Sequence, residues 1–501
     1  MDMGMGVGTK RLFFFNSVSG VAQLVLTGIL IFASIPLFIN NLGEVSYGVF
    51  CAISVIGNLG TLANLSLDAS LIKYISEQGK CQDSDNDILA TLIFLVLILV
   101  PLSLCIFIFK DFILLNVLNI PITHIKDAEI LLCYLLIANF FLLVGRVFSA
   151  ILDSLNKIYL TNLYMFIYSF LYWGGIICVT FLTRELANIG QSVFISALIW
   201  FFLVLFSALK SWGKINIRVK RSSLIVAAKK QIKYSSKIWG GSLLGFLYEP
   251  LTKILISKYI GVSYVGFYEI ALKIKSNLLA IFSKLMYPIY PLIAQEQNFD
   301  KLRLFIQKIS RLIFYAVSPI IIIFLICTEP IITLWIGGEN TQIISISTIV
   351  LVCSGLLFSS TVFPIYIFLR LKNHPEKEML IQGINVISNS LIIMTLYQYI
   401  GYNSIVLGNA LSIFCSFLIC IYFQKKYLNF YPFINLKEIG IYFVAFAFIF
   451  FVGKGTFYFL EDSSWFNIFL ISSLCIVLTL IILWKEKVIA KEMFDFFNDN
   501  S

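Results

Sequence analysis

The chain has 501 residues, of which 59% are hydrophobic and only 13% are charged, about half the charged fraction of an ordinary soluble domain. This composition excludes a separate water-soluble catalytic domain, because apolar stretches and short connections use up the length. The net charge of +10 does not indicate nucleic acid, since the cations lie beside the ends of apolar stretches, where anionic lipid headgroups attract them.

About fourteen apolar stretches of roughly 20–28 residues follow one another, and each is long enough to cross a bilayer as a helix. We therefore expect an all-α polytopic membrane protein with about 14 transmembrane helices. The expected spans are 12–39, 45–70, 88–109, 128–152, 158–182, 190–210, 237–260, 263–292, 312–336, 343–369, 379–400, 402–424, 438–460 and 464–485.

Most of the 37 Lys and Arg residues fall on every second connection, and cationic connections stay in the cytoplasm. Only Lys110, Lys126, Arg184 and Lys258 lie on the other side. Both termini are therefore expected in the cytoplasm. The first span is too long for the core of a cleavable signal, and we expect it to remain as an anchor.

The longest connection, 211–236, carries several Lys and Arg residues and no acid. We expect a basic cytoplasmic linker, a loop that lies on lipid headgroups; docking of an anionic ligand there is the alternative. A second inner connection, 296–311, mixes charge with apolar spacing and predicts a short amphipathic helix on the membrane surface.

Two turns of the chain share one pattern. Leu42-Gly43 is followed by four residues, Gly48, one residue and an aromatic, and Ile260-Gly261 is followed by the same arrangement around Gly266. Six spans separate the copies, so both halves have the same orientation, as in the parallel repeats of some transporters. We expect a six-helix lobe in 1–210, the linker 211–236, a second six-helix lobe in 237–428, and two extra helices with a cytoplasmic tail in 429–501.

Ionisable residues inside spans are costly and are candidates for function. The hairpin around Gly261 has Lys253 and Glu269 at equal distances from its turn, and Glu249 and Lys273 likewise. Each pair is therefore expected at one depth. Either the pairs form salt bridges that satisfy each other, or they line a cationic, water-filled lumen whose carboxylates exchange protons.

Helical spacing places Glu269, Lys273, Asn277 and Lys284 on one polar stripe. Arg146 lies toward the cytoplasmic end of its own span; it either pairs with Asp153, extends to the inner headgroups, or binds phosphate through its planar fork of donors.

Two further ionisable residues, Asp68 and Lys73, are expected to be anchors at the membrane interface. We expect no metal site, because only two His residues and no CxxC motif occur, and the sequence indicates no cofactor.

The order of these motifs resembles the Wzx-type O-antigen and polysaccharide flippases of the multidrug/oligosaccharidyl-lipid/polysaccharide (MOP) exporter superfamily, over essentially the whole length. The resemblance is carried by the two Gly-containing turns, by the segment 65–74 after the second span, by the segment 328–337 at the end of the ninth, and by Asn385 and Asn389.

The resemblance implies a MATE-like, two-lobed transporter of the bacterial inner membrane and no enzymatic activity. Its cargo would be an undecaprenyl-pyrophosphate-linked oligosaccharide, moved to the periplasmic leaflet by alternating access driven by an ion gradient. A glycan polymerase and a chain-length regulator are the protein partners it implies. Many relatives have an acid followed by a base in the seventh span, whereas this chain has Thr252-Lys253 with the acid at Glu249.

A pyrophosphate needs counter-charge to cross the hydrocarbon, so our hypothesis assigns pyrophosphate binding to Arg146, Lys253, Lys273 and Lys284, with Glu249 or Glu269 as the titratable partner for ion coupling. Two other functions stay open. A multidrug exporter of the same superfamily would favour an anionic cavity, and a membrane glycan polymerase or ligase would need a sizeable outer loop.

Overall fold

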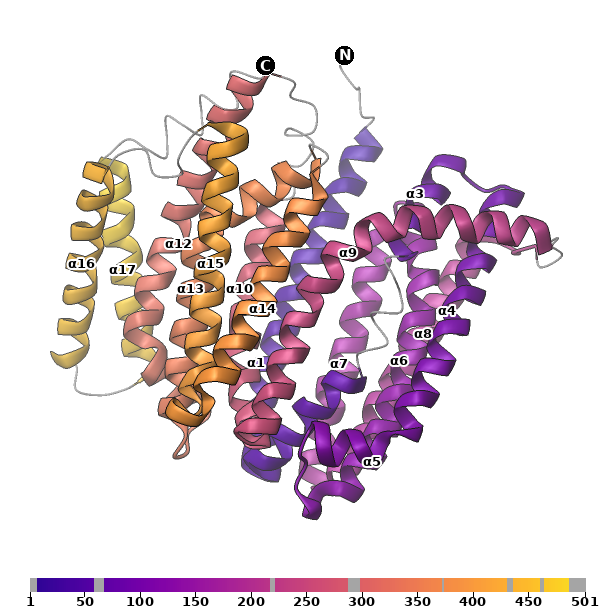
Figure 1. Cartoon of the computed structure of the whole chain (residues 1–501), viewed down its shortest axis with the longest axis horizontal. Helices are drawn as coiled ribbons and strands as arrows, with labels where there is room; N and C mark the ends of the chain where they lie inside the picture. Colours follow the sequence, from indigo (N-terminus) through magenta and orange to yellow (C-terminus); the bar gives the residue numbers. More distant parts are fainter. Residues whose placement is uncertain are drawn as a thin grey trace. The chain divides into compact units, whose positions relative to one another are not determined.

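The computed structural model describes residues 7–57, 67–216, 221–286, 298–371, 374–429, 436–459 and 464–485, and within these ranges it contains helices and no strand. The helices are α1 (Val7–Gly57), α3 (Leu67–Gln78), α4 (Gln82–Ile108), α5 (Lys110–Phe112), α6 (Ile125–Ser154), α7 (Ile158–Leu182), α8 (Leu186–Trp212), α9 (Arg221–Tyr259), α10 (Val262–Met286), α12 (Phe299–Trp335), α13 (Thr341–Leu371), α14 (Pro375–Ile400), α15 (Asn403–Leu428), α16 (Leu436–Phe459) and α17 (Trp465–Lys485) (Figure 1).

Every expected span coincides with helix over most of its described residues. Nine helical segments of the described chain are long and apolar enough to cross a membrane. The prediction of an all-α multi-pass membrane protein is therefore confirmed.

The first two expected spans share α1. Gly43, between them, has φ 86° and ψ 160°, a conformation that glycine adopts without the steric cost of a Cβ atom. The predicted turn at Gly43 is therefore a break in backbone direction between two helical segments. The second span is helical to Gly57 and again from Leu67, while 58–66 lies outside the described residues.

The helices of the seventh and ninth expected spans begin earlier in the chain than predicted. The basic connection was expected as a loop, but it is helical from Arg221 on, because Ala227, Gln231 and Ser235 recur every fourth residue and form one buried face. Likewise, the predicted surface helix continues without a break into the ninth span. Their common helix α12 begins after Asn298, whose side chain accepts hydrogen bonds from two backbone amides of the first turn.

The first part of α9 runs across the ends of α3 and α4 (Figure 1). Gln231 accepts a hydrogen bond from Thr91 Oγ1 at 2.6 Å and donates one to the backbone carbonyl of Asp87 at 2.9 Å. Lys230 forms an ion pair with the Asp87 carboxylate at 2.9 Å, and its ammonium lies 3.9 Å from the ring centre of Tyr74. These polar contacts fix the basic segment to the helix ends.

The chain divides into two compact units, Met1–Gly266 and Phe267–Ser501. The first unit contains α1 to α9 and the first residues of α10. Its core joins α3, α4, α6 and α8 through buried residues that include Leu71, Leu95, Val147, Trp200 and Val204. The division differs from the expected linker at 211–236, and the predicted domain boundaries stay predictions.

In the second unit, α12 packs on α13 and α14 packs on α15. One core lies between α10, α12 and α13 and includes Phe282, Ile313 and Leu356. The last two helices pack on α12 through a separate cluster that includes Ile326 and Cys475. The two extra C-terminal helices were expected from the sequence.

Candidate functional site

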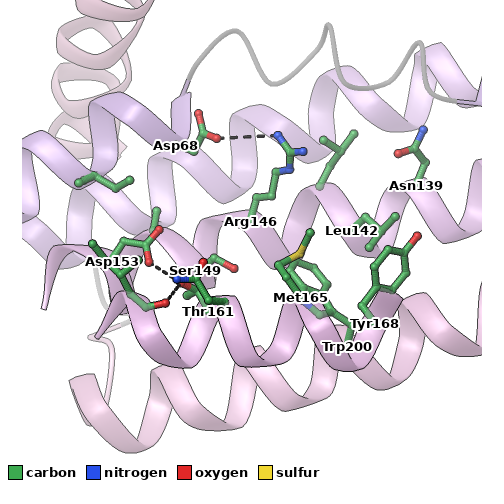
Figure 2. A pocket seen from close by; sticks show the side chains of 15 residues that line it. Asp68, Asn139, Leu142, Arg146, Ser149, Asp153, Thr161, Met165, Tyr168 and Trp200 are labelled. Atoms are coloured by element: carbon green, nitrogen blue, oxygen red, sulfur yellow. Dashed lines mark hydrogen bonds and ion pairs between the residues drawn. The ribbon is translucent and has the colours of Figure 1, made fainter. Parts of the chain in front are cut away.

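A cavity of about 400 Å³ lies inside the first unit between α3, α6, α7 and α8 (Figure 2). One face of α6 lines it from Asn139 to Asp153, with Asn139, Arg146 and Asp153 spaced seven apart. Seven residues are almost two full helical turns, so these side chains share one direction. The facing helix α7 contributes a similar row that runs from Ile158 to Tyr168.

A glycine sets the width of the cavity next to α8. A methyl group on Gly145 would lie 2.3 Å from the Trp200 ring, so the indole occupies space that only a glycine leaves open. The side chain of Trp200 is therefore held against α6 at Gly145, the residue that precedes Arg146.

The centre of the cavity holds Arg146. Its guanidinium lies 4.0 Å from the carboxylate of Asp68 on α3, and the two side chains are 49% and 32% exposed. This contact is longer than a charge-assisted hydrogen bond. The acid beside Arg146 is thus Asp68. The sequence had left open a pairing of Arg146 with Asp153 instead.

One end of the cavity is polar. The Thr161 hydroxyl donates a hydrogen bond to Asp153 Oδ1 at 2.8 Å, and the neighbouring Asn162 amide donates one to Ser19 Oγ at 2.9 Å. Figure 2 shows Asp153 and Thr161 together at one side of the view, with Arg146 between them and the aromatic end.

The opposite end is aromatic. The rings of Tyr168 and Trp200 have their centres 6.3 Å apart. Trp200 is only 2% exposed, and its indole N–H has no hydrogen-bond partner within the described residues. An unsatisfied buried donor is costly, so the position of this indole is held by packing against α6 and not by a hydrogen bond of its N–H group.

Asn139 also lines the cavity, and its amide donates a hydrogen bond to the backbone carbonyl of Gly57. This bond joins α6 to α1, and hydrogen bonds of this kind hold membrane helices together.

The other predicted site residues lie on separate elements. Lys73 is half-buried on α3 and is absent from the cavity lining. Glu249 is exposed and Lys253 is half-buried on α9. Both belong to the first unit, whereas Glu269 and Lys273 belong to the second. The predicted pairing of these residues across the hairpin therefore stays a prediction.

On α10, Lys273 forms an ion pair with Glu269 one turn away at 3.4 Å. Glu269 is buried, and Asn277 is half-buried on the same helix. The side chain of Lys284 lies outside the described residues. The side chain of Lys275, also on α10, packs against Gly355 of α13.

Sequence reasoning missed several residues of the cavity, among them Thr161, Asn162, Tyr168 and Trp200. The lining residues of α7 are spaced three and four apart, and those at one end are polar. This pattern could have indicated which face of α7 lines the cavity. Tyr168 and Trp200 gave no signal, because aromatic residues in membrane helices are common both in the core and toward lipid.

Comparison with known proteins places the chain in a family. A family model described as "Polysaccharide biosynthesis protein" matches residues 42–345, more than half of the chain. No curated protein sequence matches it.

Solved structures match over 84–96% of the chain. The lipid II flippase MurJ in an inward closed conformation has a TM-score of 0.62 at 15% identity and covers 96% of this chain and 100% of its own. An outward-facing multidrug resistance MATE transporter of the MOP superfamily has a TM-score of 0.58 at 13% identity, covering 84% of this chain and 96% of its own. A MOP superfamily transporter from Pyrococcus furiosus has a TM-score of 0.53 at 14% identity, covering 84% and 97%.

At these identities the structures establish the fold, which is that of the MOP superfamily transporters, as the sequence predicted. The chain belongs to the polysaccharide biosynthesis protein family.

Proposed function

We propose that the protein is a flippase that moves an undecaprenyl-pyrophosphate-linked oligosaccharide from the cytoplasmic to the periplasmic leaflet of the bacterial inner membrane. The family match and the transporter fold support movement of a lipid-linked substrate. In this proposal both termini lie in the cytoplasm and the protein performs no catalytic step.

The observation that carries the proposal is the placement of Arg146. Its guanidinium is half exposed in a cavity within the membrane-spanning bundle, and its contact with Asp68 is 4.0 Å long. A pyrophosphate cannot enter hydrocarbon without counter-charge, because burying an isolated ion is prohibitive. A half-exposed guanidinium whose contact with an acid is this long can offer its paired donors to phosphate oxygens.

Lys253, Lys273 and Lys284 are proposed as further phosphate contacts on the path. Glu249 and Glu269 are proposed as the carboxylates that couple transport to an ion gradient. The buried position of Glu269 beside Lys273 supports this role, since a carboxylate inside a membrane is costly unless it serves a relay or a pair.

The test is a variant in which Arg146, Lys253, Lys273 and Lys284 are all replaced by Ala. We expect lipid-linked oligosaccharide to accumulate on the inner leaflet, measured as loss of surface glycan with retention of the lipid-linked precursor. The matched control removes the same number of outer cations, Lys110, Lys126, Arg184 and Lys258, and should export glycan. Full glycan export by the first variant would overturn the proposal.

One observation favours a second function, a multidrug exporter. Two carboxylates, Asp68 and Asp153, and one guanidinium line the cavity, and a surplus of negative charge suits a cationic substrate. Cells that overproduce the protein would then become less sensitive to lipophilic cations and extrude a dye such as ethidium. The flippase proposal expects neither effect.

A further inference from the structure

The polar end of the cavity contains a carboxylate that has no cationic partner among the described residues. Asp153 is half-buried and accepts one hydrogen bond, from Thr161 at 2.8 Å. No Lys or Arg side chain lies within ion-pair distance of it in the part of the chain that the structure describes. An ionised carboxylate offers about four acceptor positions, so most of the capacity of Asp153 is open to a ligand.

The surroundings of Asp153 suit a neutral ligand rich in hydroxyl groups. Ser149 and Thr161 lie beside Asp153 in Figure 2, and Asn162, which follows Thr161 on α7, also lines the cavity. Thr161 and Asn162 are oriented by hydrogen bonds to Asp153 and Ser19. A pocket that pairs such polar groups with an apolar wall recognises its ligand by hydrogen bonds to specific hydroxyls. The cavity volume of about 400 Å³ lies in the range of small-molecule sites.

The spacing of Arg146 and Asp153 links this end to the proposed phosphate contact. The two residues are seven positions apart on one face of α6, a rise of about 10 Å at 1.5 Å per residue. A sugar bonded directly to phosphate presents an anion and, beside it, a ring of hydroxyl donors. Along α6, Arg146 could therefore contact the phosphate while Asp153 contacts the hydroxyl groups of the attached sugar.

We propose that Asp153, Thr161 and Asn162 form a subsite for the sugar attached to the pyrophosphate, in which the Asp153 carboxylate accepts hydrogen bonds from sugar hydroxyls. The inference rests on the proposed flippase function and adds to it a place where the cargo's first sugar is read. It also accounts for an acid in a cavity whose central residue is expected to bind an anion.

Binding to the purified full-length protein in detergent tests the inference with two probes. The first probe is the lipid-linked oligosaccharide extracted from the cells that make the protein, and the second is undecaprenyl pyrophosphate without sugar. The wild-type protein should bind the first probe more tightly. Asp153→Ala should lose about 10- to 100-fold affinity for it, as expected for hydrogen bonds to a charged group, while its affinity for the second probe stays within about twofold.

Two controls separate the sugar subsite from other roles. Asp153→Asn keeps an acceptor of the same shape and should lose less affinity than Asp153→Ala, whereas Asp127→Ala removes an acid at the other end of α6 and should bind both probes as the wild type does. Arg146→Ala should weaken both probes together.

Three outcomes would overturn the subsite. Asp153→Ala could weaken both probes equally, or neither, or the wild type could bind both with one affinity. If both Asp153 variants bound normally but lost transport in a way that depended on Na⁺ or pH, Asp153 would be an ion-coupling residue instead. Failure of the wild type to bind either probe would overturn the flippase proposal itself, which is a different result.

Discussion

A methyl group on Gly48 would lie 2.2 Å from the carbonyl oxygen of Val262, and one on Gly266 would lie 3.3 Å from the backbone nitrogen of Gly48. The two glycines occupy equivalent places in the two copies of the repeated turn. Each copy therefore meets the other through its second glycine, and two backbones approach where no side chain fits. The two copies of the turn pattern found in the sequence are therefore in contact with each other in the fold.

We expect Gly48→Ala to destabilise the protein, because the Cβ atom would collide with a backbone carbonyl that cannot turn aside as a side chain could. Overpacking of this kind costs about 1–3 kcal/mol. Thermal unfolding of the purified protein in detergent measures the effect.

The matched control is Gly28→Ala, in the first part of the same helix, where an added Cβ meets no atom within 4 Å. It should leave the unfolding temperature unchanged or raise it slightly, since alanine favours helix. Equal behaviour of the two variants would show that the contact at Gly48 is not tight in solution.

The Arg146–Asp68 contact gives a second prediction. Arg146→Lys keeps the charge but removes the planar fork of donors, so glycan export should fall to a level between that of the wild type and that of Arg146→Ala.

Asp68→Asn removes the acid that competes for Arg146 and should strengthen binding of undecaprenyl pyrophosphate. Initial rates of export and equilibrium binding measure the two effects, and Lys126→Ala on the same helix is the control. Export unaffected by Arg146→Ala would contradict the role of this residue.

The sequence predicted the spans and a turn at Gly43, because hydrophobic length and glycine placement are local properties of the chain. It did not predict that Asp68 would lie beside Arg146. They are on different helices, and their approach depends on how α3 packs against α6. The sequence also missed the cavity wall at Trp200, which exists because Gly145 on another helix leaves room for the indole. Sites of this kind follow from tertiary packing and cannot be read from periodicity.

Cys81 offers a test of orientation and of local electrostatics. It is exposed between α3 and α4, and its Sγ lies 3.4 Å from Ser84 Oγ. Hydrogen bonding from the Ser84 side chain and backbone lowers the pKa of the Cys81 thiol below its usual value. A larger fraction of thiolate is therefore expected at neutral pH than for an ordinary cysteine, and the thiolate is the reactive form.

We expect a membrane-impermeant maleimide to label Cys81 in inside-out vesicles and not in intact cells, if the termini are cytoplasmic. The labelling rate should rise with pH and level off at a lower pH than for an unperturbed thiol. Ser84→Ala should raise the pKa of Cys81 and slow labelling near neutral pH. Cys81→Ser gives the background from the other cysteines. Labelling in intact cells would reverse the predicted orientation.

The buried amide of Gln231 gives the last prediction. It is 1% exposed, accepts from Thr91 and donates to the backbone of Asp87, so it joins the first part of α9 to α4. Gln231→Ala would leave these partners buried without it, which costs about 1–3 kcal/mol. Thermal unfolding should therefore occur at a lower temperature, and protease cleavage near 221–233 should become faster as this segment separates from the helix ends. Lys229→Ala, on the exposed face of the same helix, should change neither measurement. If both variants behaved alike, the Gln231 contacts would not be what holds the basic segment in place.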